Sequence, residues 1–177
     1  MIDDLLGEGY RLEGIAFGLA DGLIMCLGLI IGIAEATSST QLVLITGLVG
    51  GFANAFGNSI GFFMSQSAER ALQIQTVNSG SATRIHPKRE VLANSLFSFA
   101  STIFAVFVLL LPFAFLSMGL ATMLTFAIGV ITAFALGSYV GRVGHESVIR
   151  GGLKYALLAV LGAGVSHLIA DLVLLFT

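Results

Sequence analysis

Two aspartates interrupt long apolar runs of this sequence, and both are candidates for chemistry. Asp21 lies in the segment Gly-Leu-Ala-Asp-Gly-Leu, and Asp171 lies near the end of the last apolar run. A charged side chain inside a bilayer costs about 2.5–3.5 kcal/mol on the insertion scale, and such carboxylates commonly line ion or proton pathways. Asp21 is either a hydrogen-bonded acid in a packed helix interface or, as we favour, an ion ligand or proton carrier.

A histidine accompanies the second aspartate. His167 precedes Asp171 by four residues, so the two side chains share one face of a helix. This spacing suits an imidazole oriented by a carboxylate, acting as a proton relay or exit site, and it equally suits two ligands for one divalent ion.

Uncharged polar residues and a thioether complete the candidate pathway. Asn54 and Asn58 also share a helical face, where their amides either join neighbouring helices or coordinate a cation through their oxygens. Met25 offers a soft ligand for iron-like or copper-like ions, although a methionine in an apolar run usually serves packing. We predict an ion pathway formed by Asp21, Asn58, Asn54 and Met25.

The elements that must position these residues are membrane-spanning helices. The 177-residue chain is 56% hydrophobic and only 10% charged, whereas soluble domains carry roughly a quarter charged residues. One span needs about 20 apolar residues, so the chain has room for five spans and no separate globular domain. We predict an all-α, polytopic protein with one transmembrane domain over residues 1–177.

Apolar runs and turn signals locate five spans and one substantial loop. The loop covers residues 66–90, and its first half has apolar residues at helical spacing that extend the second span. The predicted spans are residues 13–34, 42–65, 92–116, 120–141 and 153–175.

The basic residues predict the orientation of the chain. In a five-span arrangement every Lys and Arg falls on one side of the membrane, which the positive-inside rule assigns to the cytoplasm. These residues are Arg11, Arg70, Arg84, Lys88, Arg89, Arg142, Arg150 and Lys154. The N-terminus is therefore predicted to be cytoplasmic and the C-terminus outside or lumenal. Because the chain opens with Asp3, Asp4 and Glu8, we expect the first apolar run to be a span and not a signal peptide.

Glycines recur at steps of four residues in several spans. Small residues at this spacing let helix backbones approach closely, either inside one bundle or between two chains. We favour a homodimer. The pairs and triplets are Gly14, Gly18 and Gly22, then Gly47 and Gly51, then Gly57 and Gly61, and finally Gly137 and Gly141.

Several functions are excluded by missing motifs. The sequence has no phosphate-binding loop, no cysteine and histidine cluster of zinc spacing and no serine elbow, so we predict that it is not an enzyme. The net charge of −2 gives no reason to expect nucleic acid as a partner. The single cysteine, Cys26, is expected to be a small buried side chain.

Several segments together resemble the vacuolar iron transporter family. They are Gly18-Leu-Ala-Asp-Gly-Leu, a second span that ends in Gly61-Phe-Phe-Met-Ser-Gln-Ser, Pro87 before the third span, Leu-Pro-Phe around Pro112, and Gly151-Gly152-Leu at the start of the last span. The resemblance covers nearly the whole chain and implies a five-helix homodimer with a cytoplasmic N-terminus. It also implies export of ferrous or related divalent ions from the cytosol in exchange for protons.

The resemblance assigns the family's first-helix aspartate to Asp21, and two departures stand out. The family's second helix typically carries a methionine and then Gly-Glu-Tyr, where this chain has Gly57-Asn58 and Gly61-Phe62-Phe63. The family's cytoplasmic region is rich in metal-binding glutamates, of which few remain here. We expect Glu69 and Glu13 to line the cytoplasmic entrance.

We therefore predict a transporter of Fe²⁺ or Mn²⁺ in a prokaryotic plasma membrane, with the lipid bilayer, the metal ion and a second copy as partners. No permanently bound cofactor is expected, since the divalent cation is the cargo. The alternatives are a membrane bundle without transport and a carrier of another small solute.

Overall fold

The computed structural model describes residues 8–176, and this part of the chain consists of five α-helices and contains no strand. All five are long and apolar enough to cross a membrane. The predicted all-α, five-span fold is confirmed. The helices are α1 (Glu8–Thr37), α2 (Thr40–Asn78), α3 (Lys88–Phe115), α4 (Met118–Val143) and α5 (Val148–Leu174).

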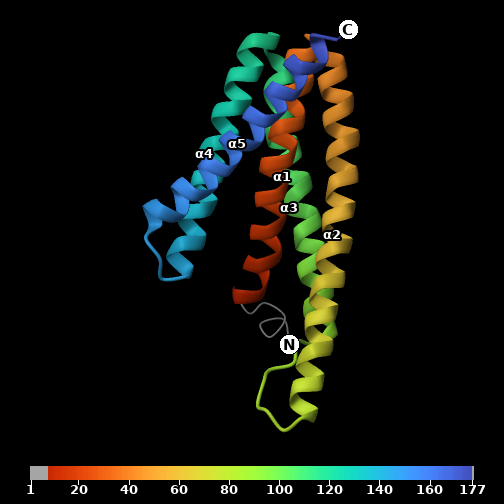
Figure 1. Cartoon of the computed structure of the whole chain (residues 1–177), viewed down its shortest axis with the longest axis vertical. Helices are drawn as coiled ribbons and strands as arrows, with labels where there is room; N and C mark the ends of the chain where they lie inside the picture. The colour runs from red at the N-terminus through yellow and green to blue at the C-terminus, as the bar shows by residue number, and fades with distance from the viewer. Residues whose placement is uncertain (1–7, 177) are drawn as a thin grey trace.

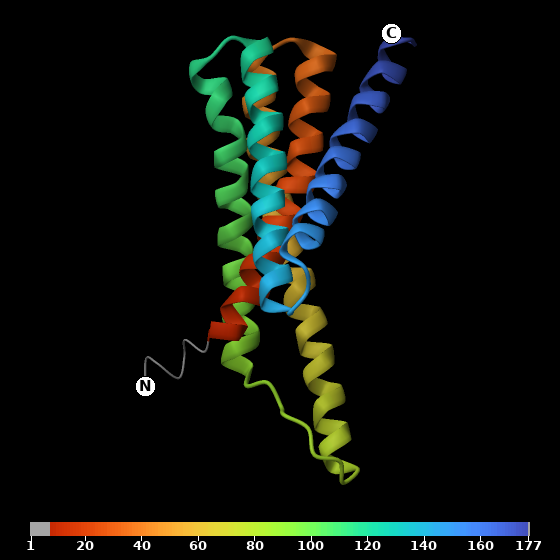
Figure 2. The ribbon, with the colours of Figure 1, turned by 90° about the vertical axis from the view of Figure 1, so that its left-hand side faces the viewer.

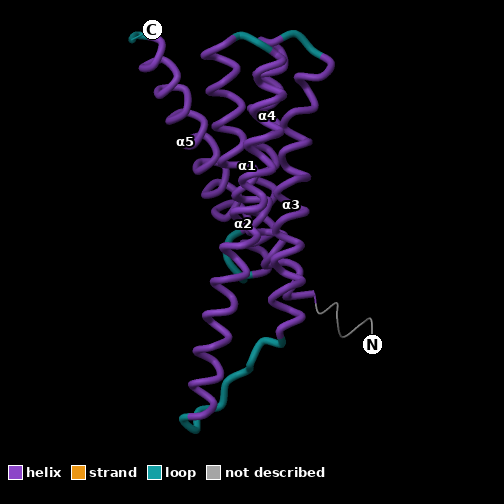
Figure 3. Tube along the Cα trace, turned by 90° about the vertical axis from the view of Figure 1, so that its right-hand side faces the viewer, coloured by secondary structure: helices purple, strands orange, loops and turns teal. Residues whose placement is uncertain are grey.

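The helices run up and down between two ends of an elongated bundle (Figure 1). The short turns from α1 to α2 and from α3 to α4 lie at the upper end, together with the end of α5. The connections from α2 to α3 and from α4 to α5 lie toward the lower end, and Figure 3 shows these non-helical segments separately. The Lys and Arg positions predicted to be cytoplasmic fall in the lower part of the bundle, and its orientation relative to a membrane remains a prediction.

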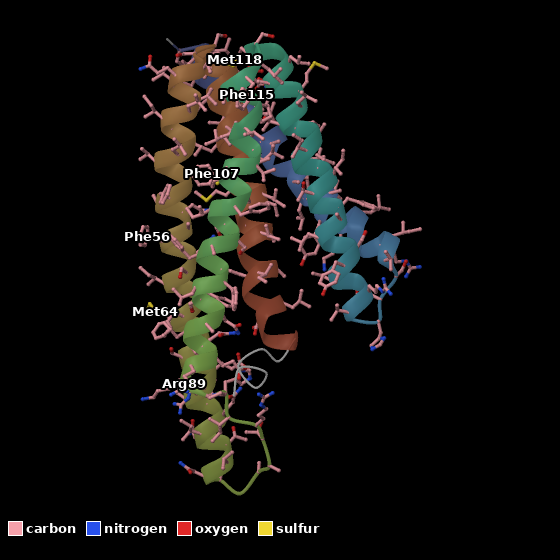
Figure 4. All side chains as sticks on the ribbon, turned by 180° about the vertical axis from the view of Figure 1, so that it is seen from behind. Phe56, Met64, Arg89, Phe107, Phe115 and Met118 are labelled. Atoms are coloured by element: carbon pink, nitrogen blue, oxygen red, sulfur yellow. The ribbon has the colours of Figure 1, made fainter. Side chains whose placement is uncertain are left out.

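The core lies around α1, which packs against all four other helices. Leu23, Leu27 and Ile30 are fully buried there against Val106 and Leu109 of α3. Cys26 is a buried free thiol on the same helix. The outer faces of the bundle carry many large exposed apolar side chains, as helices in contact with lipid do. Figure 4 shows such side chains along α2 and α3, including Phe56, Met64, Phe107 and Phe115.

The glycine series of α1 serves packing inside the chain. A Cβ atom added at Gly14 or Gly18 would lie 2.2 Å from the backbone oxygen of Asn94 or Ser98, so α1 and α3 are in backbone contact. Thr102 also donates a hydrogen bond of 2.9 Å to the Gly18 carbonyl. This contact fixes which face of α1 is turned toward α2.

The other glycine pairs divide into packed and open positions. Gly47 and Gly51 pack on side chains of α3, and Gly137 of α4 faces the backbone of Gly151 in α5. In contrast, a Cβ atom at Gly57 or Gly61 of α2 would meet nothing within 4 Å. Only this last pair leaves a small-residue surface open on a single copy of the described chain.

The connection between α2 and α3 is shorter than the loop predicted over residues 66–90. Residues 66–78 continue α2, and residues 88–90 already belong to α3. Hydrogen bonds hold this hairpin: Arg70 Nε donates to the His86 carbonyl at 2.9 Å, and the His86 amide donates to Gln73 Oε1 at 2.9 Å. At about 1.5 Å per residue, the 39 residues of α2 span about 58 Å, so the helix extends well beyond a hydrocarbon core of about 30 Å.

The last helix is the least embedded. α5 packs on α4 near its start and on α1 over its second half, and it diverges from α4 toward its C-terminal end (Figure 2). The position of the C-terminal half of α5 therefore depends on its contacts with α1.

Candidate functional site

The predicted pathway aspartate meets both predicted asparagines. Asn54 Nδ2 donates a hydrogen bond of 2.8 Å to Asp21 Oδ2, and Asn58 Nδ2 donates to the same oxygen. All three side chains are partly buried, at the contact of α1 with α2. Gly18 and Gly22 face α3, so the glycine face of α1 is occupied by that helix. Asp21 points toward α2 instead.

This trio can hold a negative charge or a cation. Amide N–H groups that converge on one carboxylate oxygen stabilise the ionised acid. An Asn side chain presents a donor and an acceptor on one planar group, so a half-turn of the amide exchanges N–H for oxygen. With the amides turned, Asp21, Asn54 and Asn58 become an all-oxygen donor set of the kind that manganese and other hard or borderline divalent ions accept.

Met25 lies one turn beyond Asp21 on α1 and is half exposed on the surface of the single chain. Its thioether is therefore not enclosed with the trio. A second copy or lipid would have to cover it.

A second polar group lies two turns below Asp21. Asn94 of α3 donates from Nδ2 to Gln66 Oε1 at 3.3 Å and, more weakly, to Glu13 Oε2 at 3.5 Å. The Gln66 amide nitrogen is buried and has no hydrogen-bond partner in the described structure. Glu13 thus reaches a polar layer, while Glu69 lies apart on the exposed part of α2 and accepts a hydrogen bond from Gln73 at 3.1 Å.

An aromatic pair separates the two polar layers. Phe17 and Phe62 stack with ring centroids 4.7 Å apart and an interplanar angle of 17°. The order along α1 is Glu13, Phe17 and Asp21, each one turn after the last, and the antiparallel α2 matches it with Gln66, Phe62 and Asn58. The seam between α1 and α2 therefore alternates polar, aromatic and polar in successive turns. Gln66 and Phe62 carry no separate signal in the sequence, because an isolated Gln or Phe in a span is usually packing.

The histidine of α5 lies between two carboxylates at the other end of the bundle. His167 Nδ1 pairs with Glu35 Oε2 of α1, and Nε2 lies 3.6 Å from Asp171 Oδ2. Glu35 and Asp171 approach different ring nitrogens, so the two carboxylates are not directed together at one metal ion.

Glu35 is a functional residue that the sequence reasoning did not select. The sequence could have indicated it, because α1 and α5 run in the same direction in a five-span chain. The C-terminal ends of both helices therefore lie at the same side of the membrane. Glu35 and His167 also border a largely apolar cavity of about 330 Å³ between α1, α4 and α5.

Residues 8–176 contain no group of three or more His, Cys, Asp or Glu side chains placed to hold a metal ion. A cation bound by one copy of the described chain would therefore depend on neutral oxygens, as in the Asp21 trio, or on groups supplied by a second copy.

Comparison with known proteins identifies relatives. A family model described as the VIT family matches residues 12–91, which cover α1 from Leu12, all of α2 and the start of α3. The chain is also 29% identical to an uncharacterized protein of the archaeon Methanocaldococcus jannaschii over 150 residues, which are 79% of this chain and 78% of that protein. The matched segment contains Asp21, Asn54, Asn58 and both members of the aromatic pair. Residues 12–91 are therefore similar to the VIT family, and the five long apolar helices make the chain a multi-pass membrane protein.

Proposed function

We propose that this chain exports divalent transition-metal ions of the iron and manganese type from the cytosol in exchange for protons, across a prokaryotic plasma membrane. The observation that carries the proposal is the convergence of Asn54 and Asn58 on Asp21 inside a membrane-spanning bundle. The similarity of residues 12–91 to the VIT family supports the class of cargo.

In the proposed mechanism, Asp21 binds a metal ion and a proton alternately. An ionised carboxylate attracts the cation, and rotation of the two amides brings neutral oxygens to it. Protonation of Asp21 removes the negative charge and weakens the attraction, which favours release of the ion. Metal and proton then compete for one acid, and this competition is the simplest form of exchange.

The alternation along the α1–α2 seam supports a gated route. Glu13 and Gln66 form the entrance layer, and the stacked rings of Phe17 and Phe62 separate it from Asp21. An ion that passes must separate the rings, so we propose that they are the gate on the entrance side. Glu69 stands outside this layer and serves to attract cations.

At the opposite end, we propose that His167 with Glu35 and Asp171 is the proton relay or exit site. An imidazole with a carboxylate near each ring nitrogen can accept a proton at one nitrogen and release a proton from the other. Because His167 is on α5 and Glu35 is on α1, the relay also changes with the position of α5 relative to α1.

We further propose that the transporter is a homodimer that meets through α2 and the adjoining face of α1. Three features support this: the open surface at Gly57 and Gly61, the half-exposed Met25, and the lack of a three-ligand cluster within the described part of one chain. A second copy would cover the seam and add oxygen or sulfur ligands to it.

The decisive experiment measures metal uptake and pH change together in proteoliposomes that contain the full chain. Replacing Asp21 by Asn keeps the size and the hydrogen-bonding capacity and removes the charge. Metal flux and the coupled proton flux are both expected to fall at least about tenfold, because even indirect partners of a metal ligand contribute that much to affinity. Glu146→Gln, an exposed acid outside the spans, is the matched control and should transport normally.

Two results would contradict the proposal. Equal flux in Asp21→Asn, accompanied by a lower unfolding temperature, would mean that the trio only joins α1 to α2 in a bundle without this transport mechanism. Failure of Fe²⁺, Mn²⁺, Co²⁺ and Zn²⁺ all to move through the unaltered protein would indicate another small solute.

A further inference from the structure

We propose that the chain binds the phosphate of an anionic phospholipid in a cavity at the lower end of α2 and α3, apart from the Asp21 site. The cavity has a volume of about 270 Å³. It is lined by Phe63, Ser67 and Arg70 of α2 and by Lys88 and Val91 of α3.

The cavity changes from apolar to cationic along its length. Phe63, Ser67 and Arg70 occupy successive turns of α2 and run away from the centre of the predicted span, which ends at residue 65. On α3, Lys88 is the first helical residue, and Val91 lies one turn closer to that centre. The apolar end therefore faces the hydrocarbon and the cationic end faces the headgroup region, which is the order of acyl chain and phosphate in a phospholipid.

The cationic end is held in place before any ligand arrives. Arg70 Nε is committed to the His86 carbonyl, so the four N–H groups of its two terminal nitrogens are left for another acceptor. This bond positions the guanidinium beside Lys88 without neutralising it. An Arg held in this way with a nearby Lys is a suitable partner for a phosphate group.

Neighbouring acids do not compensate these two charges. Glu90 is paired with Arg84 at 3.4 Å and with His86 at 2.8 Å, and Glu69 accepts from Gln73. Within the described residues, no carboxylate forms an ion pair with Arg70 or Lys88. In Figure 4, nitrogen atoms gather at the level of Arg89, below Met64 on α2. Arg70, Lys88 and Arg89 all lie where α2 and α3 leave the apolar part of the bundle.

The test compares lipid binding by the full-length protein in detergent, with native mass spectrometry and titration of phosphatidylglycerol or phosphatidylcholine. A hydrogen bond between charged groups contributes roughly tenfold in affinity, so the double variant Arg70→Gln with Lys88→Gln, which removes both cations that line the cavity, should bind phosphatidylglycerol at least about tenfold more weakly. The matched control, Arg89→Gln with Arg150→Gln, removes the same charge outside the cavity and should lose less than about threefold. Phosphatidylcholine should bind weakly to all three proteins.

A second variant keeps both charges and fills the cavity. Ser67→Phe should also weaken phosphatidylglycerol binding, and circular dichroism and size-exclusion chromatography would verify its fold. An equal loss in the control pair would show that general surface charge attracts the lipid and would overturn the proposal. Full displacement of phosphatidylglycerol by millimolar inorganic phosphate would also overturn it, since the site would then belong to a soluble phosphate compound. Normal binding by a folded Ser67→Phe protein would have the same consequence.

Discussion

At Asp21 the direction of the hydrogen bonds determines what the site presents when no cation is bound. Both amides donate to one carboxylate oxygen of Asp21. Any cation that binds must first compete with these two donors and turn the amides. The site is therefore adjustable, because the cost of turning an amide is set by the surroundings of Asn54 and Asn58 and not by the acid itself.

Phe62 gives a prediction for the aromatic gate. Phe62→Ala removes half of the stack with Phe17 and should open the entrance layer to Asp21, because only the Phe17 ring then separates the two polar layers. Metal flux without an opposing proton gradient should rise several-fold in proteoliposomes. Phe52→Ala removes an exposed ring from the same helix and should leave this leak unchanged. A Phe62→Ala protein whose metal leak is no larger than that of the unaltered protein would show that the gate lies elsewhere.

The sequence alone identified the candidate residues of the site, but it did not predict which of them contact one another. Asp21, Asn54 and Asn58 were identifiable because polar groups in spans are costly, and each one needs a partner or a function. Their convergence was not, since it depends on how far α1 is rotated about its axis. That rotation is set by the packing of Gly18 on α3, a contact between residues far apart in the chain.

At the scale of the helices, α1 has two different sides. Its glycine side touches the α3 backbone, and the adjacent side carries the alternating layers that face α2. The first contact leaves no space for adjustment, whereas the second consists of side chains that can rotate. Motion during transport is therefore expected between α2 and the pair formed by α1 and α3.

The two kinds of glycine position predict opposite effects of one methyl group. Gly18→Ala would place a Cβ atom 2.2 Å from Ser98 O and Ser101 Oγ, and the resulting separation of α1 from α3 should cost at least about 2 kcal/mol of unfolding free energy. Gly164→Ala in α5 meets nothing within 4 Å and should stabilise by up to about 1 kcal/mol through helix propensity. Thermal and denaturant unfolding in detergent measure both. Equal effects of the two changes would contradict the packing described here.

The helices themselves were largely predictable, and the reason for the one large difference is physical. Apolar runs indicate spans because the bilayer requires about 20 apolar residues. Residues 66–78 continue α2, as the helical spacing of their few apolar residues predicts, but the polar composition of the segment does not indicate where the helix ends. What holds this segment is tertiary, namely the hydrogen bonds of Arg70 and Gln73 to His86.

At the scale of the whole molecule, the open surface at Gly57 tests the proposed dimer. Cys26 is the only cysteine in the sequence and is buried, so a new surface cysteine can be crosslinked without interference. Gly57→Cys should form a dimer-sized species in native membranes on mild oxidation. Gly119→Cys, an equally open position on α4, should stay monomeric. Crosslinking at Gly119 and not at Gly57 would exclude a dimer that meets through α2.

The alternating layers of α2 have a consequence for how relatives of this protein could acquire new cargo. Asn54, Asn58, Phe62 and Gln66 stand one turn apart on a single helix: Asn54 and Asn58 contact Asp21, Phe62 contacts Phe17, and Gln66 accepts a hydrogen bond from Asn94 of α3. Selectivity can therefore diversify through four substitutions on one helix while the rest of the scaffold stays intact. A laboratory library restricted to these four codons should yield folded carriers with altered ion preference far more often than one spread over α1.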